Sequence, residues 1–150
     1  MTESEICILV TGVGGGSLGR ELIKSFQIAK TNYKIVATDM SKTSTGLFET
    51  KEKYITPKAE SADYIQLMLK ICKKEQVKVI VPGSEIEIRQ ISKNKQLFRE
   101  EGIEVLCNSL EVFEKCSDKF EMTKFLEKNG FSSPTTLLCE NESELEKIEK

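Results

Sequence analysis

The glycine-rich segment near the N-terminus is the first part of the sequence whose residue types and spacing suggest chemistry. Residues 14–19 read Gly-Gly-Gly-Ser-Leu-Gly and match the pattern G-x-G-x-x-G. They lie between an apolar, mostly β-branched run at 6–10, typical of a buried parallel strand, and a segment at 18–26 with apolar residues at helical spacing. Backbone N–H groups at the start of such a helix bind phosphate or another anion. The residues predicted to line this substrate or anion loop are Gly14, Gly15, Gly16 and Ser17.

Asp39 would complete a dinucleotide site with this loop. It lies 20 residues after Gly19, directly after a second apolar run, residues 35–38. In a dinucleotide-binding fold, an acid at this place accepts a hydrogen bond from a ribose hydroxyl. One hypothesis is therefore an NAD(P)-binding oxidoreductase module. The alternative is a tight strand-to-helix turn whose glycines allow close packing and bind no ligand.

A second group of polar residues follows the apolar run 77–81 and the Pro-Gly pair after it. Ser84 and Glu87 have the spacing of a capping box, which starts a helix. Ligands of open α/β sheets gather at the carboxyl ends of the strands, so we expect Ser84, Glu85 and Glu87 at the same edge as the glycine loop. They bind a substrate there, or they only cap the helix and interact with its dipole.

Tyr54 and Lys58 spell Y-x-x-x-K, a pair that moves protons in short-chain dehydrogenases when both lie on one helical turn. Pro57 stands between them and lacks the N–H group that a helix interior requires. The residues before it, 54–56, have the composition of a short strand. We therefore predict no catalytic role for this pair.

Composition excludes several classes of protein. The chain has 22 basic and 24 acidic residues, a net charge of −2, which argues against a nucleic-acid partner. Histidine is absent, so Ser-His or Cys-His catalysis and imidazole metal ligands are excluded, and we assign no metal ligand. The five cysteines show no C-x-x-C pair, which predicts reduced thiols and a cytoplasmic protein. A polar N-terminus and short apolar runs predict neither a signal peptide nor a membrane partner.

The order of elements predicts the fold class. Five apolar runs read as strands and alternate with segments of helical spacing. This alternation is typical of an α/β fold, a Rossmann-like, doubly wound parallel sheet of about five strands. The strands are expected at 6–10, 35–38, 54–56, 77–81 and 103–107, and the helices at 18–26, at 61–72 and from Ser84 to near Gly102.

A second part is expected from residue 109, so the predicted domains are 1–108 and 109–150. Two helices at 109–116 and 118–129 precede an extended segment at 134–139. A further charged helix should begin at Asn141, and the sequence ends inside it. We therefore expect the chain to be the first part of a longer protein.

Three segments in this order carry a resemblance to a known family. Residues 8–16 read Ile-Leu-Val-Thr-Gly-Val-Gly-Gly-Gly, and residues 79–87 read Val-Ile-Val-Pro-Gly-Ser-Glu-Ile-Glu. Residues 116–119 read Cys-Ser-Asp-Lys and are followed by a G-x-x-x-P-x-T stretch at 130–136. Together they resemble the N-terminal portion of ATP-grasp ligases, most closely the proteins similar to the carbamoyl-phosphate synthase large subunit.

The resemblance implies a Rossmann-like pre-ATP-grasp domain followed by the start of an ATP-grasp domain. In that family two further lobes clasp ATP and Mg²⁺, a carboxylate is activated as an acyl phosphate, and an amine or another nucleophile is joined to it. The N-terminal domain supplies one wall of the substrate site. By position, Lys119 resembles the lysine that reaches the ATP phosphates; the alternative is a solvated helix lysine.

The same resemblance sets further expectations. The remaining lobes of the same chain are the expected partners, with a small carboxylate and an amine as substrates. Residues 1–150 alone are expected to hold no bound cofactor and to turn over no ATP. The glycine loop of such ligases need not hold NAD, so the oxidoreductase module and a non-catalytic, Rossmann-like regulatory domain stay as the alternative functions.

Overall fold

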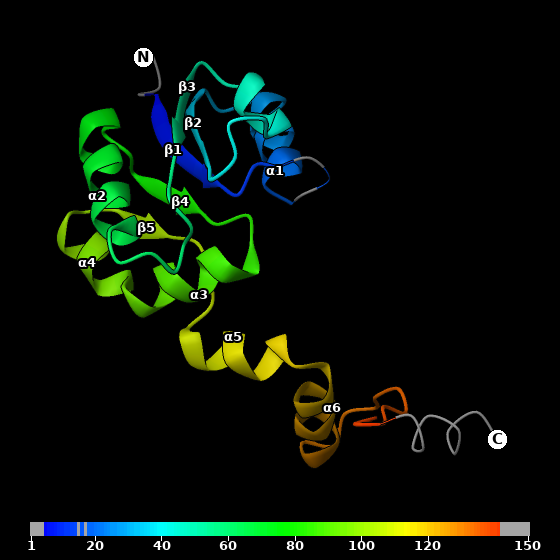
Figure 1. Ribbon diagram of the computed structural model, residues 1–150. Coiled ribbons are helices and arrows are strands. Elements are labelled where there is room, and N and C mark those ends of the chain that lie inside the picture. The colour runs from blue at the N-terminus through cyan, green and yellow to red at the C-terminus, as the bar shows by residue number, and fades with distance from the viewer. Residues whose placement is uncertain (1–4, 15, 17, 142–150) are drawn as a thin grey trace. The chain divides into compact units, whose positions relative to one another are not determined.

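The computed structural model describes residues 5–14, 16 and 18–141. The chain divides into two compact units, residues 1–108 and 109–150. The first unit contains a five-stranded sheet in the order β3-β2-β1-β4-β5, and every strand pair is parallel. The predicted α/β fold with a parallel sheet of about five strands is confirmed (Figure 1).

The strands with the most apolar sequences lie in the middle of the sheet. Leu9 of β1 pairs with Val36 of β2 on one side and with Ile80 of β4 on the other, and none of these three side chains is exposed. A parallel strand covered on both faces has this continuous apolar character. The strands are β1 (Ile6–Thr11), β2 (Tyr33–Asp39), β3 (Glu52–Ile55), β4 (Val79–Val81) and β5 (Glu104–Val105).

Helices cover both faces of this sheet, as the doubly wound prediction requires. The helix α1 lies on one side and α2 on the other (Figure 1). The connection between β2 and β3 contains a short 3-10 helix, η1. The bounds are α1 (Leu18–Gln27), η1 (Thr45–Phe48), α2 (Tyr64–Glu75), α3 (Glu85–Lys93) and α4 (Lys95–Glu100).

The core consists of two clusters, one on each face of the sheet. Alternate residues of β1 point to opposite faces, so Ile8 packs with Ile23 of α1, whereas Leu9 packs with Met68 of α2 and Phe98 of α4. The glycine loop therefore joins a buried strand to a helix whose position is fixed by packing.

The chain reverses its direction across the sheet at β1. It leaves β1 for β2 through α1, and later returns through α2 to β4, on the other side of β1. In open α/β sheets, the crevice for a ligand lies at such a point, outside the carboxyl ends of the strands. The segments after β1 and β4 are the glycine loop and the Ser84–Glu87 turn.

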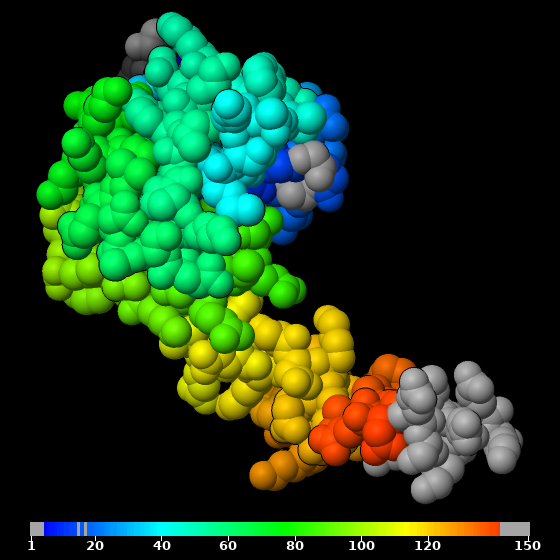
Figure 2. Space-filling model, viewed as in Figure 1, coloured from blue at the N-terminus to red at the C-terminus, as the bar shows by residue number. Residues whose placement is uncertain are grey.

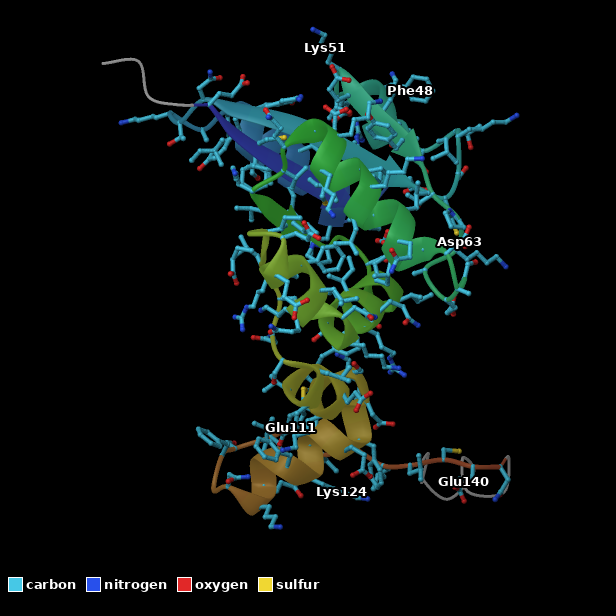
Figure 3. All side chains as sticks on the ribbon, turned by 90° about the vertical axis from the view of Figure 1, so that its left-hand side faces the viewer. Phe48, Lys51, Asp63, Glu111, Lys124 and Glu140 are labelled. Carbon is cyan, nitrogen blue, oxygen red and sulfur yellow. The ribbon has the colours of Figure 1, made fainter. Side chains whose placement is uncertain are left out.

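Two helix boundaries differ from the prediction. The helix expected from Ser84 to near Gly102 is interrupted at Asn94, whose side-chain amide donates to the carbonyl of Gln90 at 2.9 Å. This local bond offers the backbone an alternative to the helix, although the apolar spacing continues across it. Asp63, rather than Ser61, is the residue that precedes α2 (Figure 3).

The second unit contains two helices, α5 (Leu110–Ser117) and α6 (Lys119–Lys128). Asp118 caps α6 by accepting a hydrogen bond from the Glu121 N–H at 2.9 Å. Ser117 ends α5, and its hydroxyl donates to the Phe113 carbonyl. Residues 131–140 form no helix or strand, and the helix predicted after Asn141 lies outside the described residues.

Candidate functional site

A cavity of about 610 Å³ opens at the carboxyl edge of the sheet. Segments that follow four different strands line it, and the residues around 40–48 and 56–60 form one face in the space-filling view (Figure 2). Its position agrees with the crevice expected beside β1. The lining residues are Gly12, Gly14, Asp39, Met40, Ser41, Ser44, Thr56, Pro57, Lys58, Ala59, Glu60, Ser84, Ile86 and Glu87.

Glu87 is one of two nearly buried acids in the wall of the cavity. Its residue is only 7% exposed, although it lies in the first turn of a helix. The carboxylate accepts hydrogen bonds from the Ser84 hydroxyl at 2.7 Å and from the Tyr64 hydroxyl at 3.1 Å. The Ser84 hydroxyl oxygen in turn accepts from the Glu87 N–H at 3.4 Å, as the capping-box spacing predicts. Ser84 and Tyr64 thus fix the orientation of the carboxylate.

Burial favours the neutral, protonated form of both Glu87 and Tyr64. Loss of water raises the pKa of Glu87 above its ordinary value, and the negative charge of Asp39 adds to this effect. Hydrogen bonds from Ser84, Thr11 and Tyr64 partly oppose the increase. Burial and the neighbouring carboxylate also raise the pKa of Tyr64, so its hydroxyl keeps its proton and remains a donor.

Asp39 is the second acid of the cavity, at the end of β2, and is also 7% exposed. Its Oδ1 accepts a hydrogen bond from the backbone N–H of Ser41 at 2.9 Å. Its Oδ2 lies 3.6 Å from the point where a β-carbon on Gly14 would stand. The predicted proximity of Asp39 and the glycine loop is therefore present.

The glycines of the loop meet different requirements. Gly12 has φ +60° and Gly16 has φ +71°, a conformation that residues with a side chain rarely adopt. A β-carbon on Gly19 would stand 2.7 Å from the Thr11 carbonyl oxygen, so this glycine permits close contact between helix and strand. Gly83 approaches the same carbonyl. Gly15 and Ser17 lie outside the described residues.

Two contributors to the site were not predicted from the sequence. Thr11 is fully buried at the end of β1 and accepts a hydrogen bond from the Gly83 N–H at 3.4 Å. Tyr64 begins α2 and reaches Glu87 across 23 residues of sequence. The sequence signal for Thr11 is a polar residue directly after a buried run; nothing in the sequence indicates the partner of Tyr64.

Other predicted site residues lie apart from this cluster. Glu85 is exposed, and it does not line the cavity, although its neighbour Ile86 does. Lys119 is an exposed residue of α6 in the second unit. Tyr54 lies in β3 and donates to Glu75, whereas Lys58 follows the strand, so the two do not share a helical turn.

Among the described residues, no three His, Cys, Asp or Glu side chains are grouped so that they could hold a metal ion. All five cysteines are free thiols, and burial raises the pKa of Cys72 to about 12. None of the helices in the described ranges is long and apolar enough to span a membrane. The cavity wall itself presents the carboxyl groups of Asp39 and Glu87.

The comparison with protein families matches residues 8–106 to the model of the PylC-like N-terminal domain. This range contains every lining residue of the cavity. A comparison with curated protein sequences finds no relative.

Solved structures share the fold along almost the whole chain. N5-carboxyaminoimidazole synthetase from Staphylococcus aureus, in complex with ADP, is 17% identical with a TM-score of 0.64, over 99% of this chain and 37% of that one. An ADP complex of N5-carboxyaminoimidazole ribonucleotide synthetase is 21% identical with a TM-score of 0.65, over 98% and 36% of the two chains. The biotin carboxylase domain of Hydrogenobacter thermophilus 2-oxoglutarate carboxylase, with MgADP and bicarbonate, is 16% identical with a TM-score of 0.60, over 95% and 32%. The chain thus spans about a third of the length of these proteins.

Proposed function

The chain belongs to the PylC-like N-terminal domain family, and from this membership we propose that it is the substrate-side domain of an ATP-dependent carboxylate ligase. The observation that carries the proposal is the cavity at the carboxyl edge of the sheet, with Asp39 and Glu87 held nearly buried in its wall. Two fixed acids in a hollow at the point where the strand order reverses are typical of a small-molecule site.

The proposed reaction is similar to that of the carbamoyl-phosphate synthase large subunit. A carboxylate receives the γ-phosphoryl group of ATP, and an amine or another nucleophile then attacks the acyl phosphate. The role of this chain is to bind and orient one of the two substrates. Glu87, fixed by Ser84 and Tyr64, is suited to that role because it accepts hydrogen bonds in one orientation.

ATP and Mg²⁺ are the proposed cofactors of the whole protein, and they supply the phosphoryl group and its charge neutralisation. Among the described residues, only Lys119 is proposed to contact ATP, through the charge of its exposed ammonium group. The described residues contain no group suited to a metal ion, so we assign the metal ligands to the ATP-grasp lobes, the proposed partners of this domain. The free thiols favour a cytoplasmic protein.

The experiment is a coupled assay of ADP formation by the full-length protein, with pairs of small carboxylates and amines. We expect ADP to form only when a suitable carboxylate is present, and hydroxylamine to convert the acyl phosphate into a hydroxamate. Residues 1–150 alone should release no ADP above a blank without protein. The proposal is wrong if the full-length protein forms no ADP and no hydroxamate with any pair.

Two variants connect the cavity to the assay. Asp39→Asn should raise the KM of the substrate that this domain holds and leave the KM of ATP unchanged, because Asp39 lines the cavity. Glu85→Gln is the matched control, since Glu85 is an exposed acid that does not line it. Equal effects of both substitutions on every kinetic constant would show that the substrate binds elsewhere.

A further inference from the structure

The strand β3 lies at one end of the sheet, and within the described residues its outer edge has no neighbouring strand. Its inner edge pairs with β2, where the N–H of Thr56, just after β3, donates to the Asp39 carbonyl at 2.9 Å. The direction of the backbone groups alternates along a strand, so the N–H and C=O groups of Lys53 and Ile55 face away from β2. A strand edge of this kind is a template on which another strand can form.

Exposed apolar side chains lie beside this outer edge. Phe48 of η1 is 70% exposed, and Ile55 of β3 is 51% exposed. The Nζ atom of Lys53 lies 5.3 Å from the centre of the Phe48 ring, so η1 and β3 contribute to one surface. Where β3 ends, Met40, Ile55 and Pro57 line a hollow of about 550 Å³. A strand added to the edge could place an apolar side chain there.

The same surface is positively charged, although the chain as a whole has a net charge of −2. Glu49 and Glu52, the two acids between residues 40 and 58, are half-buried, and Glu49 forms an ion pair with Arg20 at 2.6 Å. The basic residues of this range are all exposed lysines: Lys42, Lys51 (Figure 3), Lys53 and Lys58. A partner with exposed carboxylates would be complementary to this charge.

We propose that the outer edge of β3 binds an extended, acidic segment of a partner protein, which adds a strand to the sheet. The backbone of this segment pairs with Lys53 and Ile55, its apolar side chains cover Phe48 and Ile55, and its carboxylates lie beside the lysines. A second copy of this chain is a poorer occupant, because lysines on an edge strand oppose pairing with the same edge. A lipid surface supplies negative charge but no backbone groups for the edge. This inference does not depend on the proposed function.

The test is a fluorescence anisotropy titration of the 150-residue chain with a short, labelled peptide that alternates glutamate and valine. We expect saturable binding that weakens as salt is added, because the charges involved are exposed. A peptide with lysine in place of glutamate is the control for charge. A peptide whose backbone nitrogens are all methylated is the control for strand pairing, because it has no N–H donors. Each control should bind about tenfold more weakly or less, the effect of losing one or two hydrogen bonds or ion pairs.

Two substitutions of Ile55 separate its backbone from its side chain. Ile55→Pro removes an N–H group that faces away from β2, a position at which an edge strand tolerates proline. Ile55→Ala is the matched variant, which loses the apolar side chain alone. The Kd of Ile55→Pro should be about fivefold higher than that of Ile55→Ala, the effect of one lost hydrogen bond. Thermal melts of both variants check that they fold.

Lys53→Glu tests the charge independently of proline. It should raise the Kd about threefold, the effect of an exposed ion pair, whereas Lys128→Glu, at an exposed lysine of the second unit, should leave the Kd unchanged.

The proposal is overturned if either control peptide binds as tightly as the acidic peptide, or if Lys53→Glu binds that peptide like wild type. Equal Kd values for folded Ile55→Pro and Ile55→Ala would also refute strand pairing. Vesicles of phosphatidylserine that bind the chain as well as the peptide does would instead assign the surface to a membrane. A dimer in analytical ultracentrifugation that Ile55→Pro abolishes would instead assign the edge to a second copy.

Discussion

The carboxylate of Glu87 lies directly against the backbone of Gly12. A β-carbon on Gly12 would collide with Glu87 Oε2, and the backbone there has φ +60°. The first residue after β1 and the first turn of α3 therefore define each other's positions. Glycine is required at position 12 for two reasons. The turn after β1 needs a positive φ, and the Glu87 carboxylate occupies the place that a β-carbon would take.

Gly12→Ala should destabilise the domain strongly. Gly102 is the control, because its φ is +71° but no described atom lies within 4 Å of its β-carbon position. Gly102→Ala should cost about 1–2 kcal/mol, the strain of the left-handed conformation alone. Gly12→Ala should cost about 1.5–3 kcal/mol more, because the displaced carboxylate loses a hydrogen bond. Urea denaturation of both variants measures the difference, and equal free energies of unfolding would contradict the contact.

The buried carboxylate should make stability depend on pH. The pKa of Glu87 is raised in the folded state by burial, so the folded protein binds the proton more tightly than the unfolded chain, whose pKa is near 4.5. The contribution of Glu87 to stability is therefore complete below 4.5 and is lost as the pH rises through its folded pKa. The charged group that faces it is Asp39, and Tyr64 stays neutral.

Glu87→Gln removes this titration. The melting temperature of the variant, relative to wild type, should rise with pH above 4.5 and then reach a plateau. Glu85→Gln should show no such trend, because Glu85 is exposed. A difference between wild type and Glu87→Gln that stays constant across the whole pH series would show that Glu87 does not titrate in this way.

The glycine loop should not bind NAD(H) or NADP(H) at sub-millimolar concentrations. A pyrophosphate at this loop would meet the carboxylates of Glu87 at Gly12 and Asp39 at Gly14, and both would repel it. Calorimetric titration of the 150-residue chain with each dinucleotide tests this expectation. A micromolar Kd that disappears in Asp39→Ala would instead support the oxidoreductase alternative.

The sequence predicted those parts of the fold that depend on neighbours in the chain. The apolar run of β1, the helix after the glycine loop and the capping box of α3 all follow from local spacing, and the structure contains each of them. The break at Asn94 was missed, because a side chain that competes with the helix leaves the apolar spacing unchanged.

The site was less predictable because its properties depend on long-range packing. Asp39 and Glu87 could be placed at one edge of the sheet from the strand order alone. The contact of Tyr64 with Glu87, and the contact of that acid with Gly12, arise only when α2 and α3 pack on the sheet. These contacts also bear on the loop: its motif predicts an anion site, whereas the carboxyl groups of Glu87 and Asp39 lie against Gly12 and Gly14.

Lys119 offers a test of the ATP-grasp assignment in the full-length protein. It occupies the first position of α6, after the cap residue Asp118. A lysine in the first turn of a helix is slightly unfavourable to the helix dipole, so its charge adds nothing to the stability of α6. We expect Lys119→Ala to weaken ATP binding by about 1.5–3 kcal/mol, the contribution of a hydrogen bond to a charged group. The melting temperature should hardly change, because an exposed helix position accepts alanine well.

Lys128→Ala is the control, since Lys128 is an exposed lysine at the other end of the same helix, and it should leave ATP affinity unaltered. If Lys119→Ala binds ATP as tightly as wild type, Lys119 is a solvated surface residue, and the ATP phosphates are held by other parts of the protein.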